Sequence, residues 1–239
     1  MAGIYSGSLI LVNAEHPLRD GRRPPLAPAA PGSSVLLETR ASAMLTGALE
    51  RLGAVGEIVP VSGWRSRAEQ QQIWDDSMAE NGEVFTRKYV AIPGCSEHQT
   101  GLAIDLALRS DSIDFIRPDF PYDGVCGRFR AIAADYGFIE RYPAGKEKIT
   151  GIAAEPWHFR YVGRPHARLM RDMGLTLEEY VELLHGYPYP GRLLSAAGGG
   201  YDAFVGFSRS YTPQEHRAPC QVSGNNVDGY ILTLWRLPA

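Results

Sequence analysis

The segment PGCSEHQTGLAIDLAL, residues 93–108, sets the architecture of this chain, because its last eight residues predict a strand with two unlike faces. Successive side chains of a strand point to opposite faces. One face of residues 101–108 carries small residues together with Asp105. A carboxylate there is costly to bury without a partner, and His98, seven residues earlier, is a candidate partner. The other face is suited to a core, with Leu102, Ile104, Leu106 and Leu108.

The composition predicts a globular protein of one large domain, or of one domain with a subdomain. The chain has 239 residues, of which 44% are hydrophobic and 21% are charged. Its net charge of -3 offers no basic surface, so we expect no nucleic-acid partner. No run approaches the roughly 18 apolar residues of a membrane span. The N-terminus lacks the basic region of a signal peptide, and three scattered cysteines form no disulfide framework, so we expect a cytoplasmic protein.

Periodicity, capping signals and turn residues predict the other elements. The motif S-x-x-E at Ser66–Glu69 opens a helix that is expected to end near Asn81-Gly82. Connections are expected at the proline-rich segment 22–32 and at the flexible segment 193–203. Helices are predicted over 34–52, 66–80, 129–136 and 177–184. Strands are predicted over 57–63, within 155–163 from the residue after Pro156, and over 229–235. We expect two parts, a domain over 1–189 and a C-terminal extension over 190–239 that packs on it.

Five polar residues could carry chemistry. His98, Asp105 and His158 are a donor set that suits zinc, and Glu155 could serve as a general base for an attacking water. Arg65 could stabilise a developing oxyanion. From spacing alone, a structural role for the histidines is favoured over a metal site, and Asp105 could merely cap a turn or pair with an arginine. Glu155 and His158 have opposite strand parity, so a kink at the intervening proline is needed to bring them together.

Three motifs in chain order carry a resemblance to a known family. SGWRSRAEQ (62–70) is similar to S-G-Y-R-S-x-x-x-Q, with Trp64 in place of the usual tyrosine. SEHQTGLAID (96–105) matches S-x-H-x-x-G-x-A-x-D, and EPWH (155–158) matches E-x-W-H. Together they resemble the D-alanyl-D-alanine metallopeptidases. The approach KYVAIPGCSEHQTG is similar to their VanY and VanXY branch, which is associated with vancomycin resistance.

The resemblance implies a fold and roles for individual residues. The fold would be the α+β fold of the hedgehog and D-Ala-D-Ala peptidases, in which an antiparallel sheet carries zinc and helices pack on its back. Glu155 would be the catalytic base, and Arg65 would stabilise the tetrahedral intermediate. One zinc ion per chain would be held by His98, Asp105 and His158. The substrate would be contacted by Ser96 and Gln70, which hold its terminal carboxylate, and by Trp157, which walls the site.

The implied activity is removal of C-terminal D-alanine from peptidoglycan precursors that end in D-Ala-D-Ala, which would eliminate the target of vancomycin. A strict dipeptidase needs an acid for the free amine of D-Ala-D-Ala. The strand before Arg65 offers none, although the loop 111–124 could supply one. We therefore favour a carboxypeptidase and keep dipeptidase activity open.

Two other functions remain as alternatives at this level. A phage-type L-alanyl-D-glutamate endopeptidase could use the same zinc site, but no wall-binding module or export route is visible. A non-catalytic zinc-binding interaction module is disfavoured because Glu155 and Arg65 are both present. The oligomeric state stays open, and a homodimer is compatible with the sequence.

Overall fold

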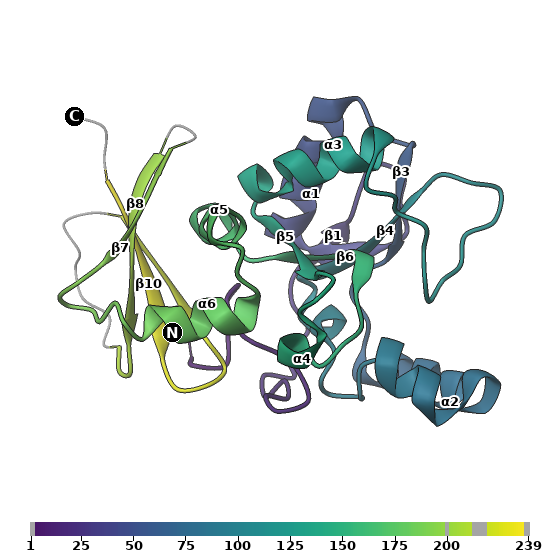
Figure 1. The fold of residues 1–239 in the computed structure, drawn as a ribbon, viewed down its shortest axis with the longest axis horizontal. Helices are drawn as coiled ribbons and strands as arrows, with labels where there is room; N and C mark the ends of the chain where they lie inside the picture. The colour runs from purple at the N-terminus through teal and green to yellow at the C-terminus, as the bar shows by residue number, and fades with distance from the viewer. Residues whose placement is uncertain (1–2, 199–200, 212–218, 237–239) are drawn as a thin grey trace.

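One of two four-stranded antiparallel sheets, called the central sheet here, lies in the right part of the view in Figure 1. The computed structural model describes residues 3–198, 201–211 and 219–236. All neighbouring strands of this sheet are antiparallel, which confirms the predicted α+β class. In spatial order the strands are β3 (Ile58–Ser62), β4 (Ala103–Leu108), β6 (Glu155–Tyr161) and β5 (Phe138–Tyr142).

Helices α1 (Thr39–Leu52) and α3 (Gly124–Ala133) cover one face of this sheet (Figure 1). In the core between them, Leu45 of α1 and Ile104 of β4 belong to one cluster of fully buried side chains. Burying an aliphatic side chain of this size stabilises the fold by about 1.5–3 kcal/mol. The large apolar side chains of β4 therefore face the helices, as its alternation predicts, and Asp105 points to the opposite face.

A two-stranded ribbon precedes α1 and shortens that helix relative to the prediction. Strand β1 (Leu26–Pro28) pairs with β2 (Leu36–Glu38), so the predicted helix 34–52 begins only at residue 39. The carboxylate of Glu38 accepts hydrogen bonds from the backbone N–H groups of Arg40 and Ala41. Pairing with β1 holds residues 36–38 in an extended conformation, and the Glu38 cap fixes the start of the helix.

Helix α2 (Arg67–Tyr89) is longer than predicted. Its capping box is present as expected, because Glu69 N–H donates to Ser66 Oγ at 3.2 Å and Ser66 N–H donates to Glu69 Oε2 at 2.7 Å. The Asn81-Gly82 pair interrupts the helix where the sequence predicts its end, because Gly82 has the non-helical angles φ 78° and ψ 170°, and a second helical segment that was not predicted follows it within α2. Glycine tolerates this left-handed φ because it lacks a Cβ.

A second antiparallel sheet lies beyond helices α5 and α6 (Figure 1). The prediction of a flexible connection over 193–203 is wrong, because strands β7 and β8 occupy most of it. Leu194 and Ala196 are buried while Ser195 between them is exposed, which is the alternation of a strand. The predicted strand at 229–235 is confirmed. In spatial order the strands are β7 (Leu194–Gly198), β8 (Tyr201–Ser208), β10 (Tyr230–Trp235) and β9 (Cys220–Gly224).

The second sheet has its own core with contributions from distant segments. Val205 of β8 and Ile231 of β10 cluster with Tyr180 of α6 and with Leu9 and Leu11 near the N-terminus. The division into a domain over 1–189 and an extension over 190–239 stays a prediction. The remaining helices are η1 (Glu97–Thr100), η2 (Ala134–Tyr136), α4 (Glu147–Thr150), α5 (Arg164–Met173) and α6 (Leu177–Leu184).

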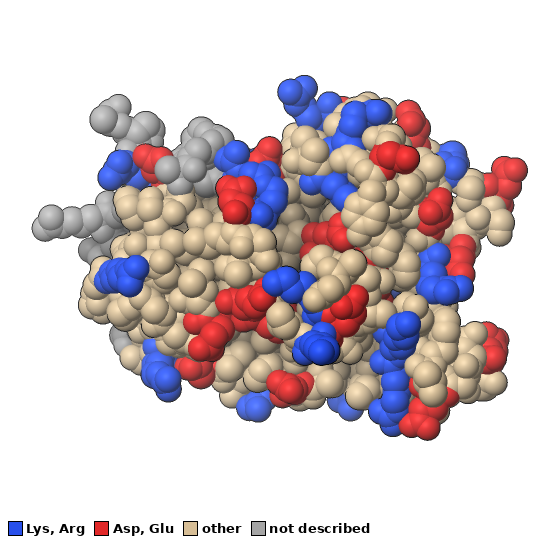
Figure 2. All heavy atoms as spheres, in the orientation of Figure 1, with Lys and Arg blue, Asp and Glu red and all other residues tan. Residues whose placement is uncertain are grey.

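The surface carries both signs of charge. Figure 2 shows acidic and basic side chains interspersed over one face, which fits the net charge of -3. Within the described residues, none of the helices combines the length and the apolar character needed to cross a membrane.

Candidate metal and catalytic site

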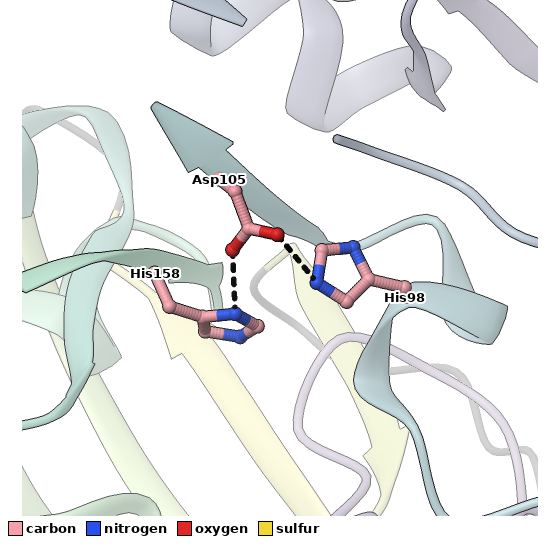
Figure 3. Close-up of side chains that lie close together, drawn as sticks. All are labelled: His98, Asp105 and His158. Carbon is pink, nitrogen blue, oxygen red and sulfur yellow. Dashed lines mark hydrogen bonds and ion pairs between the residues drawn. The ribbon is translucent and has the colours of Figure 1, made fainter. Parts of the chain in front are cut away.

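Two histidines and an aspartate meet on the face of the central sheet opposite α1 and α3 (Figure 3). Asp105 of β4 and His158 of β6 are register partners, so their side chains leave the sheet side by side. His98 reaches them from η1. The distance from Asp105 Oδ1 to His158 Nδ1 is 2.9 Å, and from Asp105 Oδ2 to His98 Nε2 it is 3.2 Å. One potential ligand atom from each residue lies within 4.8 Å of the others, and all three residues are buried.

The donor chemistry of this cluster fits a zinc ion. His98 Nδ1 lies 2.7 Å from the carbonyl oxygen of Gly63, which can only accept, so Nδ1 carries the proton. Nε2 of a neutral His98 then presents a lone pair to the carboxylate of Asp105. Burial and the charge of Arg65 lower the pKa of His98 to about 4, which disfavours a second proton on the ring. The lone pairs of His98 Nε2 and of the Asp105 carboxylate thus face each other, which suits a cation between them. Two imidazoles with one carboxylate are a common zinc ligand set.

Glu155 joins the site through an irregularity in the sheet. In the β5–β6 pair, Glu140 faces Phe159 and Tyr142 faces Glu155, so β6 advances four residues while β5 advances two. The pairing is irregular between these two pairs, and Glu155 Oε2 lies 3.7 Å from His158 Nδ1, so both side chains reach the site despite their opposite strand parity. Burial raises the pKa of Glu155 to about 8, despite the opposing effect of His158. A carboxyl with a pKa near neutrality can both accept and donate a proton at physiological pH.

Arg65 is held over the site by three hydrogen bonds. Its Nε donates to Ser62 Oγ at 2.8 Å, and its Nη1 donates to Gln70 Oε1 at 3.2 Å. Its Nη2 lies 3.2 Å from Asp105 Oδ2. The guanidinium is thus a fixed positive charge beside the cluster, as its place at the junction of β3 and α2 predicts.

The three predicted substrate-binding residues line the same cavity, which has a volume of about 50 Å³. Ser96 and Gln70 are each 1% exposed. The amide of Gln70 is already used at both ends, because its Nε2 also donates to the carbonyl oxygen of Ala91 at 2.9 Å. Trp157 both lines the cavity and belongs to the main core. The structure therefore brings all eight sequence-predicted site residues to one place.

The sequence reasoning missed a layer of charged residues behind the site. Glu97 lies next to His98 in the chain, and its carboxylate is paired with two fully buried arginines, Arg141 and Arg160. Tyr142 packs its ring 4.9 Å from that of His158. A signal was present, because a lone arginine interrupts each of the otherwise strand-like segments FIERY and HFRYV.

The acids of the cavity are all engaged within the described part of the chain. Glu97 is paired with arginines, and Asp105 and Glu155 belong to the candidate metal and base positions. The loop 111–124 contributes Phe115 and Ile116 to the cavity and none of its acids. The spare acid that a free amine would require is therefore not supplied by this loop.

Comparison with protein families identifies one matching family model. Residues 38–164 match the model described as VanY, D-alanyl-D-alanine carboxypeptidase. This span begins just before α1 and ends after β6, so it contains the whole cluster at the sheet.

Individual relatives extend the likeness beyond that span. The chain is 42% identical over 180 residues to the bifunctional D-Ala-D-Ala dipeptidase and D-Ala-D-Ala carboxypeptidase VanXYC of Enterococcus gallinarum, covering 74% of this chain and 95% of that protein. The structure is similar to that of the vancomycin resistance D,D-dipeptidase VanXYg in complex with a D-Ala-D-Ala phosphinate analogue. The TM-score is 0.93 at 46% identity, over 98% of this chain and 95% of the other.

A second solved structure matches a smaller share of the chain. It is a mutant of the vancomycin resistance D,D-pentapeptidase VanY from a VanB-type resistance cassette, in complex with Zn(II), and the TM-score is 0.61 at 33% identity. The match covers 73% of this chain and 98% of that chain. Likeness to VanXYg thus extends over a larger share of the chain than likeness to VanY.

Proposed function

The chain belongs to the VanY family of D-alanyl-D-alanine carboxypeptidases, and from this premise we propose that it is a zinc-dependent peptidase that removes C-terminal D-alanine from peptidoglycan precursors. The observation that carries the proposal is the buried cluster of His98, Asp105 and His158 with Glu155 beside it. The relatives named for vancomycin resistance support a link to glycopeptide resistance.

In the proposed site, His98 Nε2, a carboxylate oxygen of Asp105 and His158 Nδ1 would hold the zinc ion. When bound, zinc would polarise the scissile carbonyl and make a water molecule more acidic. The chain's own part is to fix the donors. Gly63 sets the tautomer of His98, and the register of β4 and β6 sets the distance between Asp105 and His158.

Glu155 and Arg65 would act on the reacting groups. Glu155 accepts a proton from the water that adds to the carbonyl carbon, then delivers it to the amide nitrogen as the C–N bond breaks and D-alanine leaves. Arg65 stabilises the negative charge that develops on the carbonyl oxygen. Its three hydrogen bonds hold the guanidinium in place beforehand, so little reorganisation is needed during the reaction.

Ser96, Gln70 and Trp157 would bind the substrate. We propose that Ser96 and Gln70 line the end of the cavity that would hold the terminal carboxylate of the substrate, and that Trp157 forms a side wall. For Gln70 the geometry supports an action through Arg65, whose Nη1 it binds.

Carboxypeptidase activity is favoured by the absence of a spare acid among the described residues that line the cavity. Dipeptidase activity is the second candidate. It is favoured by the likeness to the D,D-dipeptidase VanXYg, which spans 98% of this chain and so includes the second sheet. We propose that the enzyme acts in the cytoplasm, which the three free cysteines support. A homodimer stays a prediction for light scattering to test.

The deciding experiment measures D-alanine release from the cytoplasmic pentapeptide precursor and, separately, from D-Ala-D-Ala. Zinc-loaded protein should release D-alanine, EDTA should stop the release, and added zinc should restore it. Release from the pentapeptide identifies a carboxypeptidase, and release from the dipeptide alone identifies a dipeptidase. No release from either substrate by protein that contains zinc would contradict the proposal.

A further inference from the structure

Glu97 occupies a fully buried position directly behind His158. Its Oε1 accepts a hydrogen bond from Arg141 Nε at 2.8 Å and forms an ion pair with Arg160, whose Nη1 lies 3.0 Å away. Arg141 is also paired with Glu178 of α6 through two hydrogen bonds of 2.8 and 2.6 Å. Two guanidinium groups therefore hold one carboxylate oxygen of Glu97 in place. Because the carboxylate is rigid, this also fixes the direction of its second oxygen.

The second oxygen of Glu97 faces the ring of His158. The distance from Glu97 Oε2 to His158 Nε2 is 3.6 Å. Both atoms are buried, and neither has a hydrogen-bond partner among the described residues. A carboxylate can only accept, so the two atoms are complementary only when Nε2 of His158 carries the proton. The lone pair of the neutral ring then lies on Nδ1, which faces Asp105.

We propose that Glu97 is a positioning residue that selects the Nε2–H tautomer of His158 and thereby presents Nδ1 as a metal donor. A carboxylate behind a metal-binding histidine fixes both the tautomer and the orientation of the ring. Arg141 and Arg160 hold Glu97 ionised and in place for this role. The inference rests on the proposed function, because it takes His158 as a ligand.

The substitution Glu97→Gln tests the inference sharply. The carbonyl of the new amide accepts from the arginines, so its NH₂ group is directed at His158 Nε2. An NH₂ donor favours the opposite tautomer, with the proton on Nδ1. We expect the zinc dissociation constant, measured by competition with a chromophoric chelator, to rise about 10–100-fold. The d–d absorption spectrum of the cobalt-substituted variant should differ from that of the wild type.

The matched control is Glu178→Gln, which also removes a carboxylate from Arg141 but does not approach His158. Both variants should lose stability, whereas the control should keep its zinc dissociation constant within about threefold. Equal zinc affinity of E97Q and wild type, or equal loss in both variants, would overturn the inference. A wild-type chain that binds no zinc would overturn the proposed function and this inference with it.

A measurement on the wild type covers the case in which E97Q does not fold. Long-range ¹H–¹⁵N correlation spectra of zinc-loaded protein labelled with ¹⁵N-histidine report which ring nitrogen carries the proton. The inference expects Nε2–H and a metal-bound Nδ1 for His158. The reverse assignment would contradict it.

Discussion

At the scale of single residues, the burial of Glu155 raises the pKa of its carboxyl group towards neutrality. Its folded-state pKa of about 8 lies above the ordinary value of 4.5 because the carboxyl is buried. Between these two pH values the folded state binds more protons than the unfolded state, so this group's contribution to stability is complete below pH 4.5 and is lost as the pH rises towards 8. Glu155 therefore stabilises the fold least at the higher pH values, at which its carboxylate is ionised and able to act as a base.

Comparison of the wild type with Glu155→Gln isolates this effect. In chelator-treated protein, we expect the unfolding free energy of the wild type, relative to the variant, to fall as the pH is raised from 4.5 to 8. Urea denaturation at a series of pH values measures it. A difference between the two proteins that does not change with pH would contradict the raised pKa.

The same substitution separates catalysis from metal binding. Glu155→Gln removes the proton acceptor but none of the three proposed ligands, so kcat should fall by about 10²–10⁴-fold while the zinc content stays at that of the wild type. Turnover of the pentapeptide and metal analysis of the purified variant measure the two quantities. Unchanged kcat would remove Glu155 from the mechanism.

At the scale of elements, the site depends on where regular secondary structure is broken. The pairing of β5 with β6 is irregular between Glu140 and Tyr142, and Glu155 at the start of β6 reaches the same site as His158. In a regular strand two residues three apart point to opposite faces, so the E-x-W-H spacing needs a local irregularity to bring Glu155 and His158 together.

Helix α2 begins at a cap whose contribution can be measured. Ser66→Ala removes the hydroxyl that accepts from Glu69 N–H, and we expect a loss of about 1 kcal/mol in unfolding free energy. The exposed Glu80→Ala in the same helix serves as the control and should change stability by no more than about 0.5 kcal/mol. Chemical denaturation compares them, and equal losses would deny the cap a specific role.

At the scale of the whole molecule, metal binding and folding should be coupled. Zinc that binds only the folded chain adds about 2.7 kcal/mol at a free concentration one hundred times its dissociation constant. We expect zinc to raise the melting temperature of EDTA-treated wild type and to leave that of His98→Ala nearly unchanged. Differential scanning calorimetry distinguishes the two, and an equal shift in both would place the bound metal elsewhere.

A buried histidine joins helices α5 and α6 to the second sheet. His166 of α5 contacts Tyr180 Oη at 2.8 Å and Thr233 Oγ1 of β10 at 2.9 Å, and burial lowers its pKa to about 3. Thr233→Val leaves one ring nitrogen without a partner, so we expect a loss of about 1–3 kcal/mol in unfolding free energy. Thr233→Ser should restore most of it. Stability of the Val variant equal to that of the wild type would show that this contact does not help to hold α5 on the second sheet.

Much of the fold and of the site could be predicted from sequence because the signals are local. The alternation of residues 101–108, the S-x-x-E cap at Ser66 and the ordered motifs around His98 and His158 each depend on neighbouring residues. The start of α1 and the second helical segment of α2 were predicted less well. The start of α1 depends on the pairing of β2 with β1, which joins residues that are not neighbours in the chain.

The sequence, with the family resemblance of its motifs, predicted the α+β class and the residues that we propose as metal ligands, base and oxyanion-stabilising arginine. How these residues lie relative to one another became visible only in three dimensions. The register of β4 and β6 places Asp105 beside His158, Glu155 approaches His158 at an irregularity of the pairing between β5 and β6, and Gln70 holds Arg65. The second sheet and the buried charged residues Glu97, Arg141 and Arg160 were also identified only from the tertiary structure. The physical reason is that hydrogen-bond partners and burial depend on residues that are distant in the chain, whereas propensity and motif spacing do not.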